Sequence, residues 1–208
     1  MQLGIIGAGN VGTALAVGWI RAGHSVTFGI RDPNAPPAGP AGAAYASVAA
    51  AARGADVVVL ATPWPAVPAA LASAGDLAGK VLIDCTNPLR MGASGLELDV
   101  GHASSGGERV AALAQGASVF KTLNQTGFAN MEQAHEFAPL PAVMYVAGDD
   151  TTRMPVVLSL VSDLGFQATD AGPLRIARLL EPMAMLWIHM VVNRGEPMSR
   201  AFALAQRP

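Results

Sequence analysis

Three glycines near the start of the chain are spaced as a phosphate-binding loop requires. Gly7, Gly9 and Gly12 form the pattern G-x-G-x-x-G, which follows a short apolar run and precedes a helical pattern. In that context the first glycine permits a tight turn, the second lets the backbone approach a pyrophosphate, and the third allows a helix to pack closely on a strand. The backbone N–H groups at the start of the helix, near Asn10 and Val11, favour an anion. The segment therefore predicts a dinucleotide-binding loop.

A basic residue occupies the position at which dinucleotide-binding proteins distinguish NAD from NADP. A β-rich segment, residues 25–30, comes after the first predicted helix and is followed directly by Arg31. A strand in this place usually ends near an Asp or Glu that hydrogen-bonds the ribose 2′-hydroxyl of NAD. A guanidinium group there favours the 2′-phosphate of NADP. We therefore predict NADP(H) as the cofactor; the alternative is that Arg31 is a solvated loop charge paired with Asp32.

Polar residues follow two later apolar runs, at the points where each predicted strand ends. Thr62, Pro63 and Trp64 follow one run, and Asn87 follows the next. In a doubly wound sheet, ligands collect beyond the carboxyl ends of the strands. We therefore expect both loops beside the nicotinamide, with Asn87 as a polar contact to the ribose or the nicotinamide ring. Trp64 is expected to pack against a substrate ring or, alternatively, against the helix that it starts.

Few other side chains have types suited to proton transfer or metal binding. Lys121 ends a predicted strand, where it would polarise a substrate carbonyl or else reach solvent or a neighbouring carboxylate. His102, with Glu97 and Asp99 in a glycine-rich stretch, is the one candidate cluster for a metal or for proton transfer, and the four histidines show no metal-ligand spacing. Hydride transfer between stacked rings needs mainly orientation and exclusion of water. We therefore assign no catalytic residue and no metal site.

Strand and helix patterns alternate along the chain, which predicts an α/β fold of the Rossmann-like, doubly wound type with a mainly parallel sheet. The expected strands are residues 1–6, 25–30, 56–61, 80–84, 118–122, 142–147 and 166–170, and the expected helices are 11–22, 46–53, 64–74, 107–115 and a segment ending near residue 164. Residues 91–107 have no clear period and predict an active-site loop or lid. We expect a dinucleotide-binding domain at residues 1–123. A small C-terminal α/β region at residues 124–208, for substrate binding or dimerisation, is expected to pack on the same sheet.

Two details of the C-terminal region can be predicted from residue type. Asp149 and Asp150 precede a helical pattern and are expected to cap it, because carboxylates accept hydrogen bonds from the free N–H groups of a helix start. Pro182 lies within a long apolar helical stretch. An interior proline removes a hydrogen bond, so we expect this helix to be kinked or split in two.

Composition limits the partners and the setting of the protein. Hydrophobic residues make up 51% of the 208 residues and charged residues only 13%, which favours a buried apolar interface and a homodimer. The net charge of −2 and the scattered basic residues argue against nucleic acid as a partner. The apolar run 183–192 is about half the length needed to cross a bilayer, so no membrane association is expected. The single cysteine, Cys85, and the absence of a leader pattern predict a cytoplasmic protein with a packed thiol.

With these residues laid out, the sequence resembles the family of NADP oxidoreductases that use the deazaflavin coenzyme F420. The matching segments are, in chain order, residues 7–12, Arg31, and residues 62–64, 128–130, 148–150 and 170–174. The resemblance implies that the glycine loop holds the pyrophosphate, that Arg31 meets the 2′-phosphate, and that Thr62 and Pro63 line the nicotinamide ribose and ring. Archaeal members have a serine before the arginine and a lysine soon after it, where this chain has Ile30 and no lysine. Asn124 takes the place of a histidine.

Three functions are consistent with this sequence. The preferred one is an NADP(H)-dependent oxidoreductase that transfers hydride between the nicotinamide and a flat ring such as F420 or a flavin, with Trp64, Asn124 and Thr126 on the side of this small-molecule acceptor. The second is an NADPH-dependent carbonyl or imine reductase, in which Lys121, Asn124 or His102 acts as proton donor or polariser. The third is a non-enzymatic NADP-binding sensor.

Overall fold

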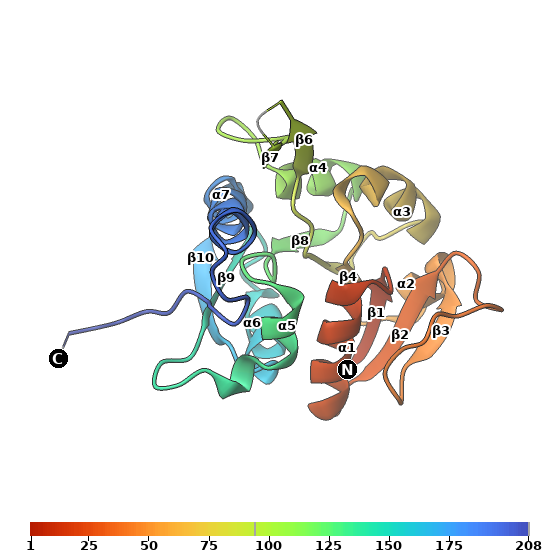
Figure 1. Ribbon diagram of the computed structural model, residues 1–208. Coiled ribbons are helices and arrows are strands. Elements are labelled where there is room, and N and C mark those ends of the chain that lie inside the picture. Colours follow the sequence, from red (N-terminus) through yellow and green to blue (C-terminus); the bar gives the residue numbers. More distant parts are fainter. Residues whose placement is uncertain (94, 208) are drawn as a thin grey trace.

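Eight strands form one sheet in the computed structural model, which describes residues 1–93 and 95–207 (Figure 1). The strand order is β10-β9-β8-β5-β4-β1-β2-β3, and every neighbouring pair is parallel except β8 and β9. The strands are β1 (Gln2–Ile6), β2 (Ser25–Ile30), β3 (Ala44–Ser47), β4 (Val57–Leu60), β5 (Val81–Asp84), β8 (Ser118–Lys121), β9 (Val143–Gly148) and β10 (Gln167–Gly172). The central strands β4 and β5 are buried along their whole length, as strands covered on both faces must be. The predicted fold class is confirmed.

Helices cover both faces of the sheet. One face carries α1 (Asn10–Arg21), α5 (Phe128–Glu132) and α6 (Met154–Asp163), and the other carries α2 (Val48–Gly54), α3 (Val67–Ala74) and α4 (Gly106–Leu113). Helix α7 (Ala177–Ile188) packs against α4, and a π-helical turn η4 (His189–Asn193) continues it. Short 3₁₀ turns are η1 (Trp64–Ala66), η2 (Ala134–Glu136) and η3 (Leu174–Ile176). The result is a three-layer arrangement with two cores.

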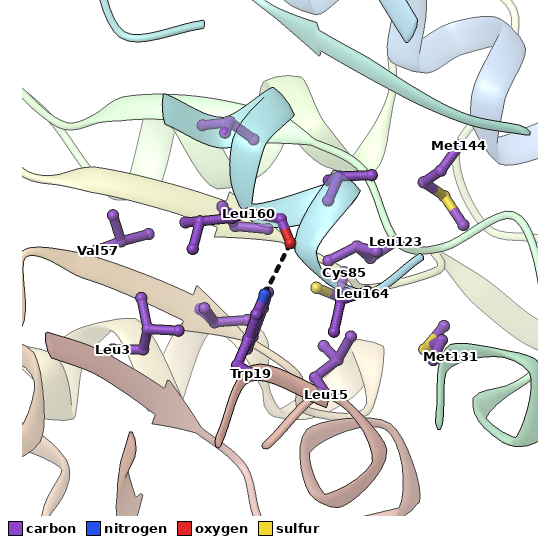
Figure 2. Close-up of a cluster of buried hydrophobic side chains, with 14 of the residues drawn as sticks. Leu3, Leu15, Trp19, Val57, Cys85, Leu123, Met131, Met144, Leu160 and Leu164 are labelled. Atoms are coloured by element: carbon purple, nitrogen blue, oxygen red, sulfur yellow. Dashed lines mark hydrogen bonds between the residues drawn. The ribbon is translucent and has the colours of Figure 1, made fainter. Parts of the chain in front are cut away.

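The larger core joins the first helix to the C-terminal half of the chain. Trp19 on α1 is fully buried, and its indole N–H donates a hydrogen bond of 2.8 Å to the carbonyl oxygen of Leu160 on α6 (Figure 2). Leu3, Leu15 and Val57 pack in the same cluster. Trp19 lies near the C-terminal end of α1, so this contact anchors the helix at the end opposite the glycine loop.

The register of the strands aligns their carboxyl ends along one edge of the sheet. Ile6 of β1 lies opposite Leu60 of β4, Leu60 lies opposite Asp84 of β5, and Asp84 lies opposite Lys121 of β8. The predicted ligand loops begin directly after these strand ends. A ligand site is therefore expected along this edge of the sheet.

Two regions differ from the sequence-based expectation. Residues 44–47, where no strand was expected and a helix was expected to begin at residue 46, form β3 beside β2, and Ser47 then caps α2 by accepting a hydrogen bond from Ala50 N (3.3 Å). The expected loop or lid at residues 91–107 contains most of an antiparallel hairpin, β6 (Leu89–Gly92) and β7 (Gly95–Leu98), joined by an Arg90–Glu97 ion pair of 2.6 Å. Ser94 in this stretch, and Pro208 in the C-terminal region, lie outside the described residues. Strands β6 and β7 are only four residues long, which is too short to show a periodic pattern of apolar residues in the sequence.

The C-terminal helices correct two further expectations. Helix α7 continues through Pro182, so the alternative of a helix split in two at the proline is wrong, and Leu180, Glu181 and Ala184 on either side of it are buried. Asp150 Oδ1 accepts hydrogen bonds from Thr152 N (3.1 Å) and Arg153 N (3.2 Å) in the turn before α6, so it lies at the predicted helix start. Asp149 Oδ1 instead accepts a hydrogen bond from Leu174 N (2.9 Å), the first residue of η3.

The wider organisation follows from the same contacts. Strands β9 and β10 extend the sheet begun by the first half of the chain, and the division at residues 123 and 124 stays a prediction. Among the helices described, none has the length and apolar character to span a membrane.

Candidate dinucleotide-binding site

Two glycines of the loop after β1 have no room for a side chain. Gly7 has a φ of +113°, and an added Cβ would lie 2.5 Å from the carbonyl oxygen of Ala61. A Cβ on Gly12 would overlap the carbonyl oxygen of Gly7. Gly7 thus permits the turn, and Gly12 lets α1 pack closely on the loop.

Gly9 has the opposite surroundings. It is exposed, and no atom lies within 4 Å of a Cβ built on it. It precedes α1, whose start carries neither a side-chain cap nor an acidic residue in its first turn. The backbone N–H groups of Asn10, which is also exposed, and of the half-buried Val11 belong to this start. Open space beside uncapped N–H groups is what an anionic ligand requires.

A cavity of about 920 Å³ lies beside this loop, at the upper end of the range for small-molecule sites. Its walls come from the ends of β1, β2 and β4 and from α2 and α3. The lining residues are Ile6, Gly7, Ala8, Gly9, Gly29, Ile30, Arg31, Asp32, Ala35, Pro37, Val48, Ala61, Thr62, Pro63, Ala66, Ala69, Ala70 and Ser73. Most are small or apolar, which suits a wall that packs against flat rings and sugars.

Arg31 is exposed and lines this cavity. The carboxylate of Asp32 accepts a hydrogen bond from the backbone N–H of Asn34 (3.0 Å), so it forms a local turn. No ion pair joins Arg31 to Asp32 in the described part of the chain, which leaves the guanidinium group available to a phosphate.

Thr62 supplies an independent sign of a ligand. Its Oγ1 atom is buried and has no hydrogen-bond partner within residues 1–93 and 95–207, and the residue lines the cavity next to Pro63. Buried hydroxyl groups are nearly always hydrogen-bonded in native proteins. A ribose hydroxyl or phosphate oxygen in the cavity fits this unmatched group.

Thr62 and Pro63, predicted for the nicotinamide side, line this cavity, but the four other residues predicted for the nicotinamide and substrate side do not. Asn87 and Asn124 form a reciprocal pair, in which Asn124 Nδ2 donates to Asn87 Oδ1 (3.1 Å) and Asn87 Nδ2 donates to the carbonyl oxygen of Asn124 (3.2 Å). Thr126 is buried and accepts a hydrogen bond from Asn130 Nδ2 (2.8 Å). Trp64 packs partly against the second core and donates its indole N–H to Asp99 (2.9 Å). Of these four, Asn87 and Trp64 are half-buried and the other two are buried.

Lys121 is fully buried beneath this side of the edge. Its ammonium group lies 2.9 Å from Asp84 Oδ2 and 3.2 Å from Glu181 Oε1. Burial alone would lower the pKa of Lys121, but the two facing carboxylates outweigh it and raise the pKa, so the group stays charged. The neighbouring Cys85 has a raised pKa because it is buried and lies beside Asp84, so its thiol is unreactive.

The candidate cluster in the glycine-rich stretch is dispersed among arginines. Glu97 pairs with Arg90, and Asp99 contacts Arg109 at 3.7 Å in addition to Trp64. Over the described residues, no three His, Cys, Asp or Glu side chains are grouped so as to hold a metal ion. The Arg90–Glu97 pair joins the two strands of the β6–β7 hairpin, and the Asp99–Arg109 contact joins the residue after the hairpin to α4.

Several residues of the site were missed from the sequence. One wall of the cavity is made by Ala66 at the end of η1 and by Ala69, Ala70 and Ser73 of α3, whose side chains are too small to signal a function. Asp84 and Glu181 were also missed. Each is a carboxylate within an apolar segment, and that is the signal that could have found them.

A mainly parallel sheet of this strand order, with a glycine loop between β1 and α1 and a cavity at the strand ends, defines a Rossmann-type dinucleotide-binding protein. The model of the family described as NADP oxidoreductase, coenzyme F420-dependent, matches residues 2–88. The F420-dependent NADP reductase of Methanothermobacter thermautotrophicus is 30% identical over 211 residues, which cover 93% of this chain and 90% of that protein.

Solved structures agree with this relationship. A candidate F420-dependent NADP reductase from Arthrobacter sp. FB24 superposes with a TM-score of 0.89 at 31% identity, over 99% of this chain and 100% of the other. A reductive aminase from Aspergillus terreus, solved with NADPH and ethyl levulinate, has a TM-score of 0.68 at 24% identity, and the match spans 93% of this chain but 62% of the aminase. The latter likeness is one of fold alone.

The chain belongs to the family of coenzyme F420-dependent NADP oxidoreductases. The predictions of an NADP-dependent oxidoreductase and of NADP(H) as its cofactor are confirmed at the level of this family.

Proposed function

We propose that the protein transfers hydride between NADP(H) and a flat ring acceptor of the deazaflavin F420 or flavin type. The observation that carries the proposal is the cavity at the carboxyl ends of β1, β2 and β4, which combines the open space at Gly9, the exposed Arg31 and the unmatched hydroxyl of Thr62. The F420-dependent NADP reductase of M. thermautotrophicus, similar over most of both chains, supports the choice of acceptor.

The chain's own residues bind and orient the nucleotide in this proposal. Gly7, Gly9 and Gly12 shape the loop, and the N–H groups at Asn10 and Val11 bind the pyrophosphate. The Arg31 guanidinium binds the 2′-phosphate with charge-assisted hydrogen bonds. Bound NADPH supplies the hydride.

The nicotinamide side is assigned to residues that follow β4, β5 and β8. Thr62 donates or accepts a hydrogen bond at the nicotinamide ribose, and Pro63 packs against the ring. Asn87 holds the ribose or the ring. We place Trp64, Asn124 and Thr126 toward the acceptor, where they exclude water and shape the pocket.

A carbonyl or imine reductase is less well supported, because two of the three donors predicted for it, Lys121 and Asn124, are occupied. The three hydrogen-bond partners of Lys121 are Asp84, Glu181 and the Thr86 carbonyl oxygen. The Asn124 amide group donates to Asn87 and Leu180 and accepts from Gln125. Neither group is available to protonate a substrate, and hydride transfer between stacked rings does not need such a donor.

The test is NADPH oxidation by the pure protein with a panel of acceptors: F420, FMN, ketones and imines. We expect turnover with F420 or FMN and none with ketones or imines. Turnover of an imine or ketone alone would overturn the proposal in favour of the second function. Tight NADPH binding with no turnover of any acceptor would favour the sensor.

We further propose that the protein is a homodimer of the reducing cytoplasm. Large apolar side chains on α7 and η4 are exposed at helical spacing, with Leu179 65%, Leu186 52% and Met190 38% exposed. The single buried thiol of Cys85 suits a reducing compartment. The C-terminal part of the chain, after residue 123, would supply the dimer contact.

Light scattering after size-exclusion chromatography tests the dimer. The wild-type protein is expected at twice the mass of 21.2 kDa, and Leu186→Glu at the mass of one chain, because a charge placed in an apolar interface is strongly unfavourable. A monomeric wild-type protein would contradict this part of the proposal.

A further inference from the structure

A buried ion cluster lies directly beneath the turn that carries Asn87. It consists of Lys121, Asp84 and Glu181, which are at most 1% exposed, and we name it the Lys121 cluster. Asp84 and Lys121 lie opposite each other at the ends of β5 and β8, and Glu181 reaches them from α7. Three segments far apart in the sequence meet at one ammonium group.

Every charged atom of the cluster has a partner. Asp84 Oδ1 accepts hydrogen bonds from Thr86 N (2.9 Å) and Thr86 Oγ1 (2.7 Å), and Lys121 also donates to the Thr86 carbonyl oxygen. Glu181 accepts from Gly106 N (2.8 Å) and Gly107 N (2.9 Å) at the start of α4. A fully satisfied polar network of this kind rigidifies the segments that it joins.

Two glycines let the backbone approach the cluster. A Cβ on Gly106 would lie 3.0 Å from Glu181 Oε1 and 3.2 Å from Pro88 Cγ, and one on Gly107 would lie 3.2 Å from Ala177 Cβ. A residue with a side chain at these positions would push α4 away from Glu181. The glycine pair and the carboxylate thus fit each other, which is independent support for a defined geometry at this point.

Stability alone is a weak reason for such a cluster. Two buried carboxylates and one ammonium group leave a net negative charge, and buried ion pairs are often no more stabilising than apolar residues of the same volume. The fixed position of the joined segments is the better explanation. The segment that it fixes most firmly is Thr86, which is bonded to both Asp84 and Lys121.

Thr86 connects the cluster to the accessible part of the site. Residues 81–86 and Pro88 are buried, and Asn87 between them is half-buried. Its side chain is paired with Asn124, three residues beyond Lys121. The position of this amide pair therefore depends on Lys121 in two ways. Lys121 holds Thr86, which precedes Asn87, and Asn124 follows Lys121 after two intervening residues.

We propose that Lys121 is a positioning residue for the nicotinamide half of the site. With Asp84 and Glu181 it fixes the turn at Thr86 and Asn87 against the nicotinamide riboside, whereas the adenosine half is held independently by the glycine loop and Arg31. The inference rests on the proposed function, because it takes NADP(H) as the ligand.

The experiment compares two ligands that share the adenosine half. NADPH and adenosine 2′,5′-bisphosphate, which lacks the nicotinamide riboside and the phosphate attached to it, are titrated by calorimetry into the wild-type protein and into Lys121→Met. We expect the variant to lose about tenfold in affinity for NADPH and less than about twofold for the bisphosphate. A fold-stabilising role alone would not change the ratio of the two affinities.

The other lysine of the chain provides a matched control. Lys80 precedes β5 at the opposite edge of the sheet, and its ammonium group also donates to backbone carbonyl oxygens, those of Arg53 (3.1 Å) and Ala55 (2.6 Å). Strands β5 and β8 are paired, so Lys80→Met removes a lysine beside the same two strands and leaves every contact of the Lys121 cluster in place. It is expected to leave the ratio of the two affinities unchanged.

Glu181→Gln keeps the test decisive where Lys121→Met does not fold. The substitution preserves volume and removes the acceptor of one of the two N–H groups at Gly106 and Gly107, and we expect a selective loss of about threefold for NADPH. Equal losses for both ligands, or no loss in a folded variant, would overturn the proposal. The titrations contain no acceptor, so a failure to reduce F420 would affect the proposed function and leave this result intact.

Discussion

The two halves of the strand-end edge are built in opposite ways. At the ends of β1, β2 and β4, small residues and backbone groups surround a cavity of about 920 Å³, and Arg31 and Thr62 bring groups that the chain itself does not satisfy. At the ends of β5 and β8, the charged groups of Lys121, Asp84 and Glu181 satisfy one another and Asn87 pairs with Asn124, although the buried Thr122 hydroxyl has no partner among the described residues. In the first half, a ligand must supply the missing hydrogen-bond and charge partners. In the second half, the contacts that hold the turn at Asn87 are already formed without a ligand. Binding and orientation of the nucleotide are thereby separated in the structure.

The largest expected effect comes from filling the open space of the first half. Gly9→Val should lower NADPH affinity by more than about 100-fold, because its side chain occupies the approach of the pyrophosphate to the backbone. The fold should survive, since no atom lies within 4 Å of the new Cβ. Calorimetry gives the affinity, and thermal unfolding gives the stability.

Gly12→Val is the contrasting variant in the same loop. Its Cβ overlaps the Gly7 carbonyl oxygen, so the melting temperature should fall as well as the affinity. Normal NADPH binding by Gly9→Val would show that the loop does not hold the pyrophosphate, and the contrast between the two halves would no longer hold.

Arg31→Asp tests which part of the cofactor the first half distinguishes. It removes the partner of the 2′-phosphate and adds a repelling charge, so NADPH affinity should fall by about 30-fold and NADH affinity by less than about twofold. Competition titrations with both cofactors measure the difference. Equal losses for NADPH and NADH would mean that Arg31 does not bind the 2′-phosphate.

The smallest effect is expected at the opposite edge of the sheet, at Asp150. A hydrogen bond from Ser118, with others from Thr152 and the backbone, lowers the pKa of Asp150 from its ordinary value of 3.8 to about 2. Because the folded-state pKa is the lower one, this stabilisation is present above the ordinary value and is lost as the pH falls toward 2.

Asp150→Asn should therefore lose stability at neutral pH and show a shallower decline in acid than the wild-type protein. Melting temperatures from neutral pH into acid measure this, and the ratio of NADPH to bisphosphate affinity should stay at the wild-type value. A changed ratio would show that polar contacts anywhere on the sheet influence the nicotinamide side, and the special position of the Lys121 cluster would be lost.

The difference between the two halves also explains what could be predicted from the sequence. Gly7, Gly9, Gly12 and Arg31 act through local backbone geometry within the first 31 residues, so their spacing alone indicates the fold and the cofactor. Strands β4, β5, β8 and β9 could also be predicted, because each coincides with an apolar run of the kind that marks a buried strand.

The second half depends on contacts that no spacing reveals. Glu181 meets Lys121 across 60 residues of sequence, and its role follows only from the packing of α7 on α4. Lys121 itself was recognised as a candidate, but whether it faces solvent, a substrate or a carboxylate is decided by tertiary structure. The short strands β3, β6 and β7 were missed for the same reason, since pairing partners and not local propensity create them.

The most direct test of the central claim is a single turnover in a stopped-flow instrument. The complex of the protein with NADPH is mixed with F420, and in parallel with FMN, while the fluorescence of the nicotinamide and the absorbance of the acceptor are recorded. We predict that NADPH fluorescence and acceptor absorbance disappear at the same rate with at least one of the two rings. If both signals persist with F420 and also with FMN, in a protein that binds NADPH tightly, the proposal is contradicted.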